Sequence, residues 1–252
     1  MEEQLNQLTF EERKSLEYFF SIAIKKDHLG HVLFFSDKPA CLIGANASSN
    51  QSKQDALFTE GWKVWKEKEH LFPHPNFLIF HEIVDFGDNN SALHIYFINK
   101  KTLSNLISKN EEFFNEFKDC YLSNLEKNKI DSLADADQAF VGVLLGYGIE
   151  ASKAYKYNKI KKNPKDSTLE LILCAKDGEV TLNKRASNTR YSLTCVVDKE
   201  VNVLPVTFLG NPSSKEVQML QKKYTEQRSE IEAIFRKKEL LKTALKALCE
   251  TR

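Results

Sequence analysis

The sequence predicts an α+β protein in which antiparallel β-hairpins pack against helices and a long C-terminal helix closes the chain. Three observations lead to this prediction. Apolar side chains recur at helical spacing in several stretches, a strong turn signal separates two β-prone runs, and a heptad-like pattern fills residues 213–248. The chain has 252 residues, 42% of them hydrophobic and 28% charged, as in ordinary globular proteins. We expect one domain over 1–252, with a candidate sub-boundary near 159–166.

Two amphipathic helices are predicted in the first seventy residues. Thr9 and Glu12 have the spacing of a capping box, and the apolar residues that follow predict a helix from Thr9 to Ile24. A second helix is expected from Asp55 to Glu69, where large apolar side chains fall on one stripe. That stripe consists of Phe58, Trp62 and Trp65.

Two hairpins are also predicted in the first hundred residues. The first would join the β-prone runs 31–35 and 40–43 through a polar turn that contains Pro39. The second would join 77–86 and 92–98 through Gly87-Asp88-Asn89-Asn90, the strongest hairpin signal in the chain. The sequence therefore predicts at least four antiparallel strands before residue 100.

A guessed register of the second hairpin separates its side chains into two faces. The face expected to be core carries Leu78, Phe80, Val84, Phe86, Leu93, Ile95 and Phe97. The other face would carry His81, Asp85, His94 and Tyr96. A carboxylate beside two imidazoles can bring pKa values into a range useful for acid–base catalysis. His81, Asp85 and His94 are therefore candidate catalytic residues, with an ordinary half-solvated sheet face as the alternative.

The rest of the chain alternates helical and strand-like patterns. Helices are expected at 102–108, 111–125 and 135–157, and strands at 169–175, 190–197 and 201–209. Within 135–157, the glycines at 142 and 146 predict close helix packing, and Gly148 a kink.

One long helix is expected from Ser213 to Leu248, with a serine as its N-cap. Its apolar stripe could contact another copy of the chain or a partner helix, and burial in the core of the monomer is the alternative. The candidate contact residues are Leu220, Tyr224, Ile231, Ile234 and Leu241.

A Lys-rich segment follows the central helices and is a candidate binding surface. It contains Lys153, Lys156, Lys159, Lys161, Lys162 and Lys165, with two tyrosines between them. Lysines interleaved with aromatic rings can bind a phosphate backbone, but cations at the C-terminal end of a helix give the same pattern. Residues 1–150 are net acidic and 151–252 net basic, so the two parts can also neutralise each other. We therefore rank nucleic acid below protein as a partner.

The pattern of histidines and cysteines predicts neither a metal nor a cofactor. His70 and His74 are four residues apart, but Pro73 between them breaks the helix that would align them. The five cysteines are scattered and form no C-x-x-C pair. Gly142 to Gly148 lacks the residues of a phosphate-binding loop.

The sequence predicts a cytoplasmic protein without a membrane span. The first residues are acidic and show no basic segment followed by an apolar one, and no apolar run approaches the length that a bilayer needs. Secretion by a signal-independent route stays open as an alternative.

Three stretches, taken together, carry a resemblance. They are GHVLFFSDKPACL at 30–42, VLLGYGIEA at 143–151 and LPVTFLGNP at 204–212. In this order they resemble a group of uncharacterised predicted proteins of chlamydia-like intracellular bacteria. The resemblance implies a bacterial origin and a setting of host interaction, such as an effector. That group has no assigned activity, so the resemblance transfers no functional residue.

These observations favour a non-enzymatic protein-interaction module that works through the C-terminal helix and the Lys-rich segment, with a protein partner or with itself. The alternative is a hydrolase-like enzyme on the sheet face of His81, Asp85 and His94. The first hypothesis requires an exposed apolar stripe on the long helix. The second requires the two histidines to line one concave pocket.

Overall fold

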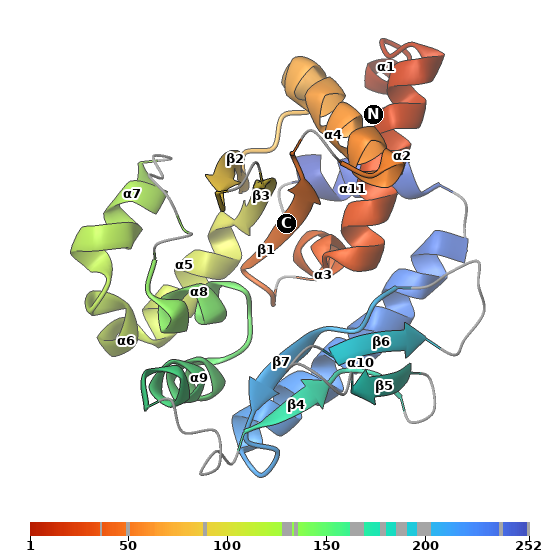
Figure 1. Cartoon of the computed structure of the whole chain (residues 1–252). Helices are drawn as coiled ribbons and strands as arrows, with labels where there is room; N and C mark the ends of the chain where they lie inside the picture. The colour runs from red at the N-terminus through yellow and green to blue at the C-terminus, as the bar shows by residue number, and fades with distance from the viewer. Residues whose placement is uncertain are drawn as a thin grey trace.

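The computed structural model describes residues 1–35, 37–48, 51–87, 90–127, 133, 136–161, 169–176, 180–184, 191–195, 203–236 and 239–250. Of residues 126, 158–161, 180–184 and 191–195 it describes only the backbone. The fold is α+β, as predicted: in the described part of the chain, helices combine with one three-stranded and two two-stranded antiparallel sheets (Figure 1). No helix of the described residues is both long and apolar enough to cross a membrane.

The three-stranded sheet lies between two layers of helices. Its order is β1-β3-β2, with β1 at Ala40–Asn46, β2 at Phe77–Asp85 and β3 at Ser91–Asn99. Ile95 and Phe97 of the central strand belong to one hydrophobic core, and Tyr96 and Ile98 belong to another. Both faces of β3 are therefore apolar, as expected for a strand covered by helices on both sides.

The N-terminal helices pack on one face of the sheet and form the first core. They are α1 (Glu2–Leu5), α2 (Phe10–Lys26), α3 (Leu29–Phe34) and α4 (Lys53–Lys68), and a short 3-10 turn, η1 (Glu69–Leu71), follows α4. The predicted capping box is confirmed, because Thr9 Oγ1 accepts from the Glu12 amide at 3.2 Å and Glu12 Oε2 accepts from the Thr9 amide at 2.8 Å. Helices α2 and α4, both predicted, pack face to face.

The second core covers the opposite face of the sheet with α5 (Lys100–Lys109), α6 (Glu111–Asn115), the π-helical turn η2 (Lys118–Leu122), α7 (Ser123–Glu126) and α8 (Gln138–Leu144). Helix α9 (Ile149–Lys161) continues from α8 after a turn. An aromatic cluster lies at the centre of the second core and consists of Phe113, Phe114, Phe117 and Phe140.

The third core lies between α9, the strand pair β4 (Glu170–Leu173) and β7 (Thr207–Gly210), and helix α10 (Lys215–Arg236). A second strand pair consists of β5 (Val180–Lys184) and β6 (Tyr191–Cys195). The chain closes with α11 (Leu240–Cys249), which packs on α2 and α3 of the first core.

Several predicted elements differ from the structure. The predicted helix 111–125 is divided into α6, the π-helical turn η2 and α7, and the described residues 203–206 of the predicted strand 201–209 lie outside β7. Residues 29–34 form helix α3 instead of a strand, because a short helix buried on all sides has no polar face to show its period. The predicted helix 135–157 is broken between α8 and α9, where Gly146 and Gly148 have φ angles of 78° and 83°. The predicted helix 213–248 is two helices, because the backbone of Glu239, just before α11, has φ −120° and ψ 42°, outside the helical region.

Candidate functional site

The predicted grouping of His81, Asp85 and His94 is wrong. In the β2–β3 hairpin His81 is paired with Ile95 and Asp85 with Ser91, whereas His94 is paired with Glu82. Directly opposed residues share a face, so the first two side chains lie on one side of the sheet and His94 on the other. The guess failed because both faces of the sheet are apolar, so hydrophobic alternation cannot choose the register.

His81 and Asp85 have separate surroundings. The exposed imidazole of His81 contacts the edge of the Trp62 ring, with 5.5 Å between the ring centroids. Asp85 Oδ1 accepts a hydrogen bond of 2.9 Å from the Gly87 amide and so caps the hairpin turn. A hydrolase centred on these three residues has no support in this geometry.

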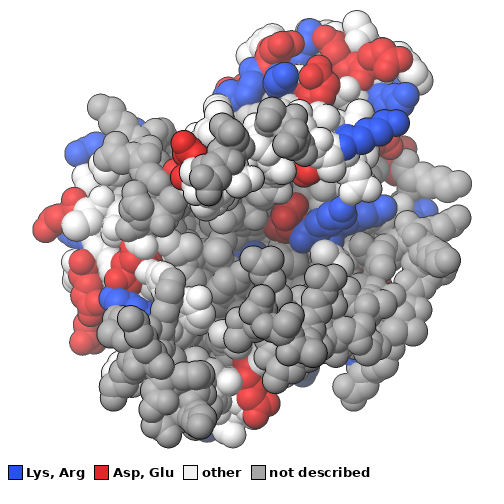
Figure 2. All heavy atoms as spheres, viewed as in Figure 1, with Lys and Arg blue, Asp and Glu red and all other residues white. Residues whose placement is uncertain are grey.

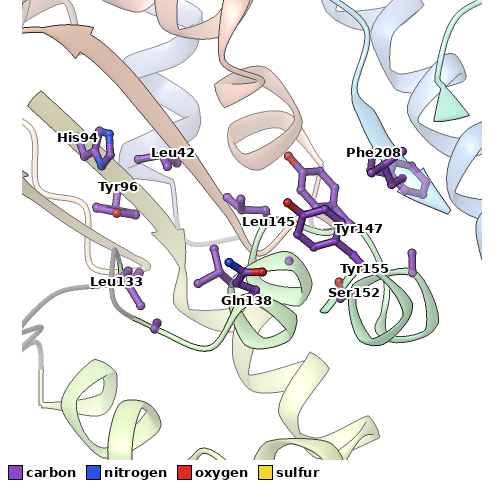
Figure 3. A pocket seen from close by; sticks show the side chains of 15 residues that line it. Leu42, His94, Tyr96, Leu133, Gln138, Leu145, Tyr147, Ser152, Tyr155 and Phe208 are labelled. Carbon is purple, nitrogen blue, oxygen red and sulfur yellow. The ribbon is translucent and has the colours of Figure 1, made fainter. Parts of the chain in front are cut away.

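His94 instead lines a cavity of about 400 Å³, which we call the α8–α9 cavity. Its walls come from β1, β3, α8, α9 and β7, which are far apart in the sequence (Figure 3). The lining is mostly apolar and aromatic. Its described residues are Leu42, His94, Tyr96, Leu133, Ala136, Gln138, Val141, Gly142, Leu145, Tyr147, Ala151, Ser152, Tyr155, Phe208 and Leu209.

The turn between α8 and α9 forms one wall of the cavity and is fixed from behind by two buried side chains. Lys38 Nζ donates a hydrogen bond to the carbonyl oxygen of Leu145, and Tyr224 Oη donates one of 2.6 Å to that of Gly146. The ammonium of Lys38 also lies over the rings of Tyr147 and Tyr224, at 5.1 and 5.7 Å from their centroids. Burial lowers the pKa of Lys38 to about 8.

Helix α9 is held at its N-terminus by α10. Both carboxylate oxygens of Glu216 accept hydrogen bonds of 2.9 Å, one from the Ile149 amide and one from the Glu150 amide. A carboxylate at this position satisfies two open amides and interacts favourably with the helix dipole. The wall of the cavity is therefore anchored to the C-terminal part of the chain.

Several polar groups interrupt the apolar lining. Tyr96 Oη donates to Glu82 Oε1 at 2.5 Å, and Nδ1 of His94 lies 3.9 Å from the same oxygen. Burial raises the pKa of Tyr96, so its phenol stays protonated. Ser152 Oγ and His94 Nδ1 are both buried, and neither has a hydrogen-bond partner among the described residues.

A chain of polar side chains runs beside Lys38, from the buried His31 and Gln227 to the exposed Asp37. His31 Nδ1 lies 3.0 Å from Gln227 Oε1, and Gln227 Nε2 donates to Asp37 Oδ2 at 2.9 Å. With this orientation of the amide, the neutral imidazole of His31 donates through Nδ1. Lys223 pairs with the other Asp37 oxygen at 2.9 Å.

The buried cysteines near this chain are not activated. Burial raises the pKa of the Cys41 thiol, and it raises that of Cys174 to about 12. A nucleophilic cysteine needs a lowered pKa instead. Among the described residues, no group of three His, Cys, Asp or Glu side chains could hold a metal ion.

The predicted contact residues of the C-terminal helix lie mostly inside the chain. Tyr224, Ile231 and Leu241 are buried, and Leu220 and Ile234 are half-buried. This arrangement matches the alternative in which the helix packs in the monomer's own core. Among the described side chains of α10, Met219 is a large apolar one that is exposed.

The Lys-rich segment is described only in part. Lys153 Nζ lies 5.2 Å from the centroid of the Phe113 ring, and Lys156 pairs with Asp137, the N-cap of α8. The side chains of Lys159 and Lys161, and the whole of Lys162 and Lys165, lie outside the described residues. On the face drawn in Figure 2, acidic and basic side chains are interspersed over the described surface.

Comparisons of the chain with protein-family models, with curated proteins and with solved structures find no match. The resemblance to proteins of chlamydia-like bacteria stays a prediction. The cavity was not predicted from the sequence, since only the kink expected at Gly148 indicated the turn that shapes it, and its other walls meet through tertiary contacts.

Proposed function

We propose that this protein binds a small, largely apolar ligand in the α8–α9 cavity. The observation that carries the proposal is the cavity itself. Its volume of about 400 Å³ falls within the range of about 300–1,000 Å³ that is usual for small-molecule sites. Such sites also have an apolar and aromatic lining with a few polar groups, which is the composition found here.

The support for a preformed cavity comes from the anchors behind its wall. Lys38, Tyr224 and Glu216 hold the turn and the start of α9 through hydrogen bonds to the backbone. Because these contacts are made between groups of the chain itself, we expect little ordering free energy to be lost when a ligand binds. Burial of the ligand's apolar surface then provides the driving force, at about 25 cal/mol per Å².

A protein-interaction role through the C-terminal helix and the Lys-rich segment stays a prediction with less support. The buried positions of Tyr224, Ile231 and Leu241 leave no continuous apolar stripe exposed on the described part of α10 and α11. Lys153 and Lys156 already have partners within the chain. The single domain over 1–252 and the sub-boundary near 159–166 likewise stay predictions.

Binding can be tested with N-phenyl-1-naphthylamine, an uncharged probe whose fluorescence rises in apolar surroundings. We expect saturable binding to the wild-type protein. Val141→Trp should weaken it by at least about tenfold, because Val141 lines the cavity and the larger ring occupies the space of the ligand.

Met219→Trp is the matched control, since it adds the same ring at a side chain that is 72% exposed on α10. This variant should bind the probe like the wild type. Absence of saturable binding to the wild type would refute the proposal, as would equal binding by the two tryptophan variants when both are folded by circular dichroism.

A further inference from the structure

We infer that the ligand of the α8–α9 cavity is an uncharged amphiphile, with an apolar body and an uncharged hydrogen-bonding head. This inference rests on the proposed function and specifies the class of ligand. It follows from the charges around the cavity, from the positions of its polar groups and from the free energy of burying an ion.

The lining offers no lysine, arginine or carboxylate side chain to an ionic ligand. None of the described lining residues is Lys, Arg, Asp or Glu. The nearby ammonium of Lys38 lies behind Leu145 and Tyr147 and is already bound to the Leu145 carbonyl and to aromatic rings. It is therefore not available to a carboxylate in the cavity.

An acidic group beside the cavity disfavours an anionic ligand further. Glu82 lies beside His94 and Tyr96, and its carboxylate accepts the hydrogen bond of the Tyr96 hydroxyl. A ligand carboxylate near these side chains would meet a charge of the same sign. Transfer of an unpaired carboxylate or ammonium ion from water into an apolar site costs on the order of several kcal/mol of free energy.

An uncharged hydrogen-bonding head fits the polar groups that are present. Figure 3 shows His94 and Tyr96 at one side of the cavity and Ser152 and Tyr155 at the other, with Gln138 and Leu145 between them. Ser152 Oγ is buried without a partner among the described residues. A hydroxyl or amide can both donate and accept, so it can bond to such groups without bringing a charge.

The test compares three competitors that share a ten-carbon chain and differ only in the head: decan-1-ol, decanoate and decylammonium. Each is used near neutral pH to displace N-phenyl-1-naphthylamine from the wild-type protein. We expect decan-1-ol to displace the probe at a concentration at least about tenfold lower than either ion, because the ions lose hydration without gaining a partner.

A designed change of selectivity gives a second measurement. Val141→Lys places an ammonium on the cavity wall, and it should shift the preference towards decanoate over decan-1-ol by at least about tenfold. Met219→Lys adds the same charge at an exposed position of α10 and should leave the preference unchanged.

The outcomes separate this inference from the proposed function. If the probe binds but decanoate or decylammonium displaces it as well as decan-1-ol does, the inference is wrong and the proposed function stands. An unchanged preference in a folded, probe-binding Val141→Lys variant would also overturn it. If the probe does not bind to the wild type, the proposed function itself fails.

Discussion

Gly146→Ala is expected to destabilise the protein by about 2–4 kcal/mol and to weaken probe binding in the cavity. Gly146 has a φ angle of 78°, where an alanine is strained by about 1 kcal/mol or more. A Cβ atom there would also lie 2.5 Å from Tyr224 Oη and 3.1 Å from Lys38 Cγ. Both anchors of the α8–α9 turn must therefore move. Urea denaturation measures the first effect and a fluorescence titration the second.

Gly87→Ala is the matched control for this substitution. Gly87 has nearly the same φ angle, 79°, but a Cβ atom there would meet nothing within 4 Å. Its substitution should cost only the backbone strain, about 1 kcal/mol, and leave probe binding unchanged. Equal losses of stability in the two variants, with equal binding, would contradict the role that we give to the anchored turn.

The free energy of unfolding of the wild type, relative to that of His31→Gln, is expected to decrease by about 3 kcal/mol as the pH falls from about 7 to about 4. Burial lowers the pKa of His31 from its ordinary value of 6.5 to about 4. Between these values the unfolded chain binds a proton that the folded chain does not. The stabilisation is therefore complete above pH 6.5 and is lost as the pH falls towards 4.

The measurement is a comparison of urea midpoints of the two proteins across this pH range. A comparison is needed because other buried groups titrate as well. Burial lowers the pKa of His28 in the same sense, whereas it raises that of Asp27 to about 7, which acts in the opposite sense. His81→Gln is the control, since this histidine is exposed. A difference between wild type and His31→Gln that stays constant with pH would refute the prediction.

Elements with local signals could be predicted from the sequence. The capping box of Thr9 and Glu12 and the turn at Gly87 depend on residues a few positions apart, and the structure places α2 and the β2–β3 hairpin there. The short helix α3 was missed because it is buried on all sides, so composition alone made it resemble a strand.

The candidate site depends on contacts that no local pattern reveals. Leu42, His94, Val141 and Phe208 come from four distant segments, and they meet only when the second and third cores have formed. The register of the β2–β3 hairpin decides which histidine reaches the cavity, and a shift by one residue would exchange the faces. The sequence therefore indicated His94 as a site residue but grouped it with His81 and Asp85, which lie on the other face of the sheet.

The most direct test of the account is a titration of methyl-labelled protein with N-phenyl-1-naphthylamine, followed by methyl chemical shifts. The cavity predicts concentration-dependent shifts at the lining side chains Leu42, Val141 and Leu145. It predicts none at Leu57 or Met219, which are exposed elsewhere. Shifts at Leu57 or Met219, with the lining methyl groups unmoved, would show that the probe binds outside the cavity and would contradict the proposed function.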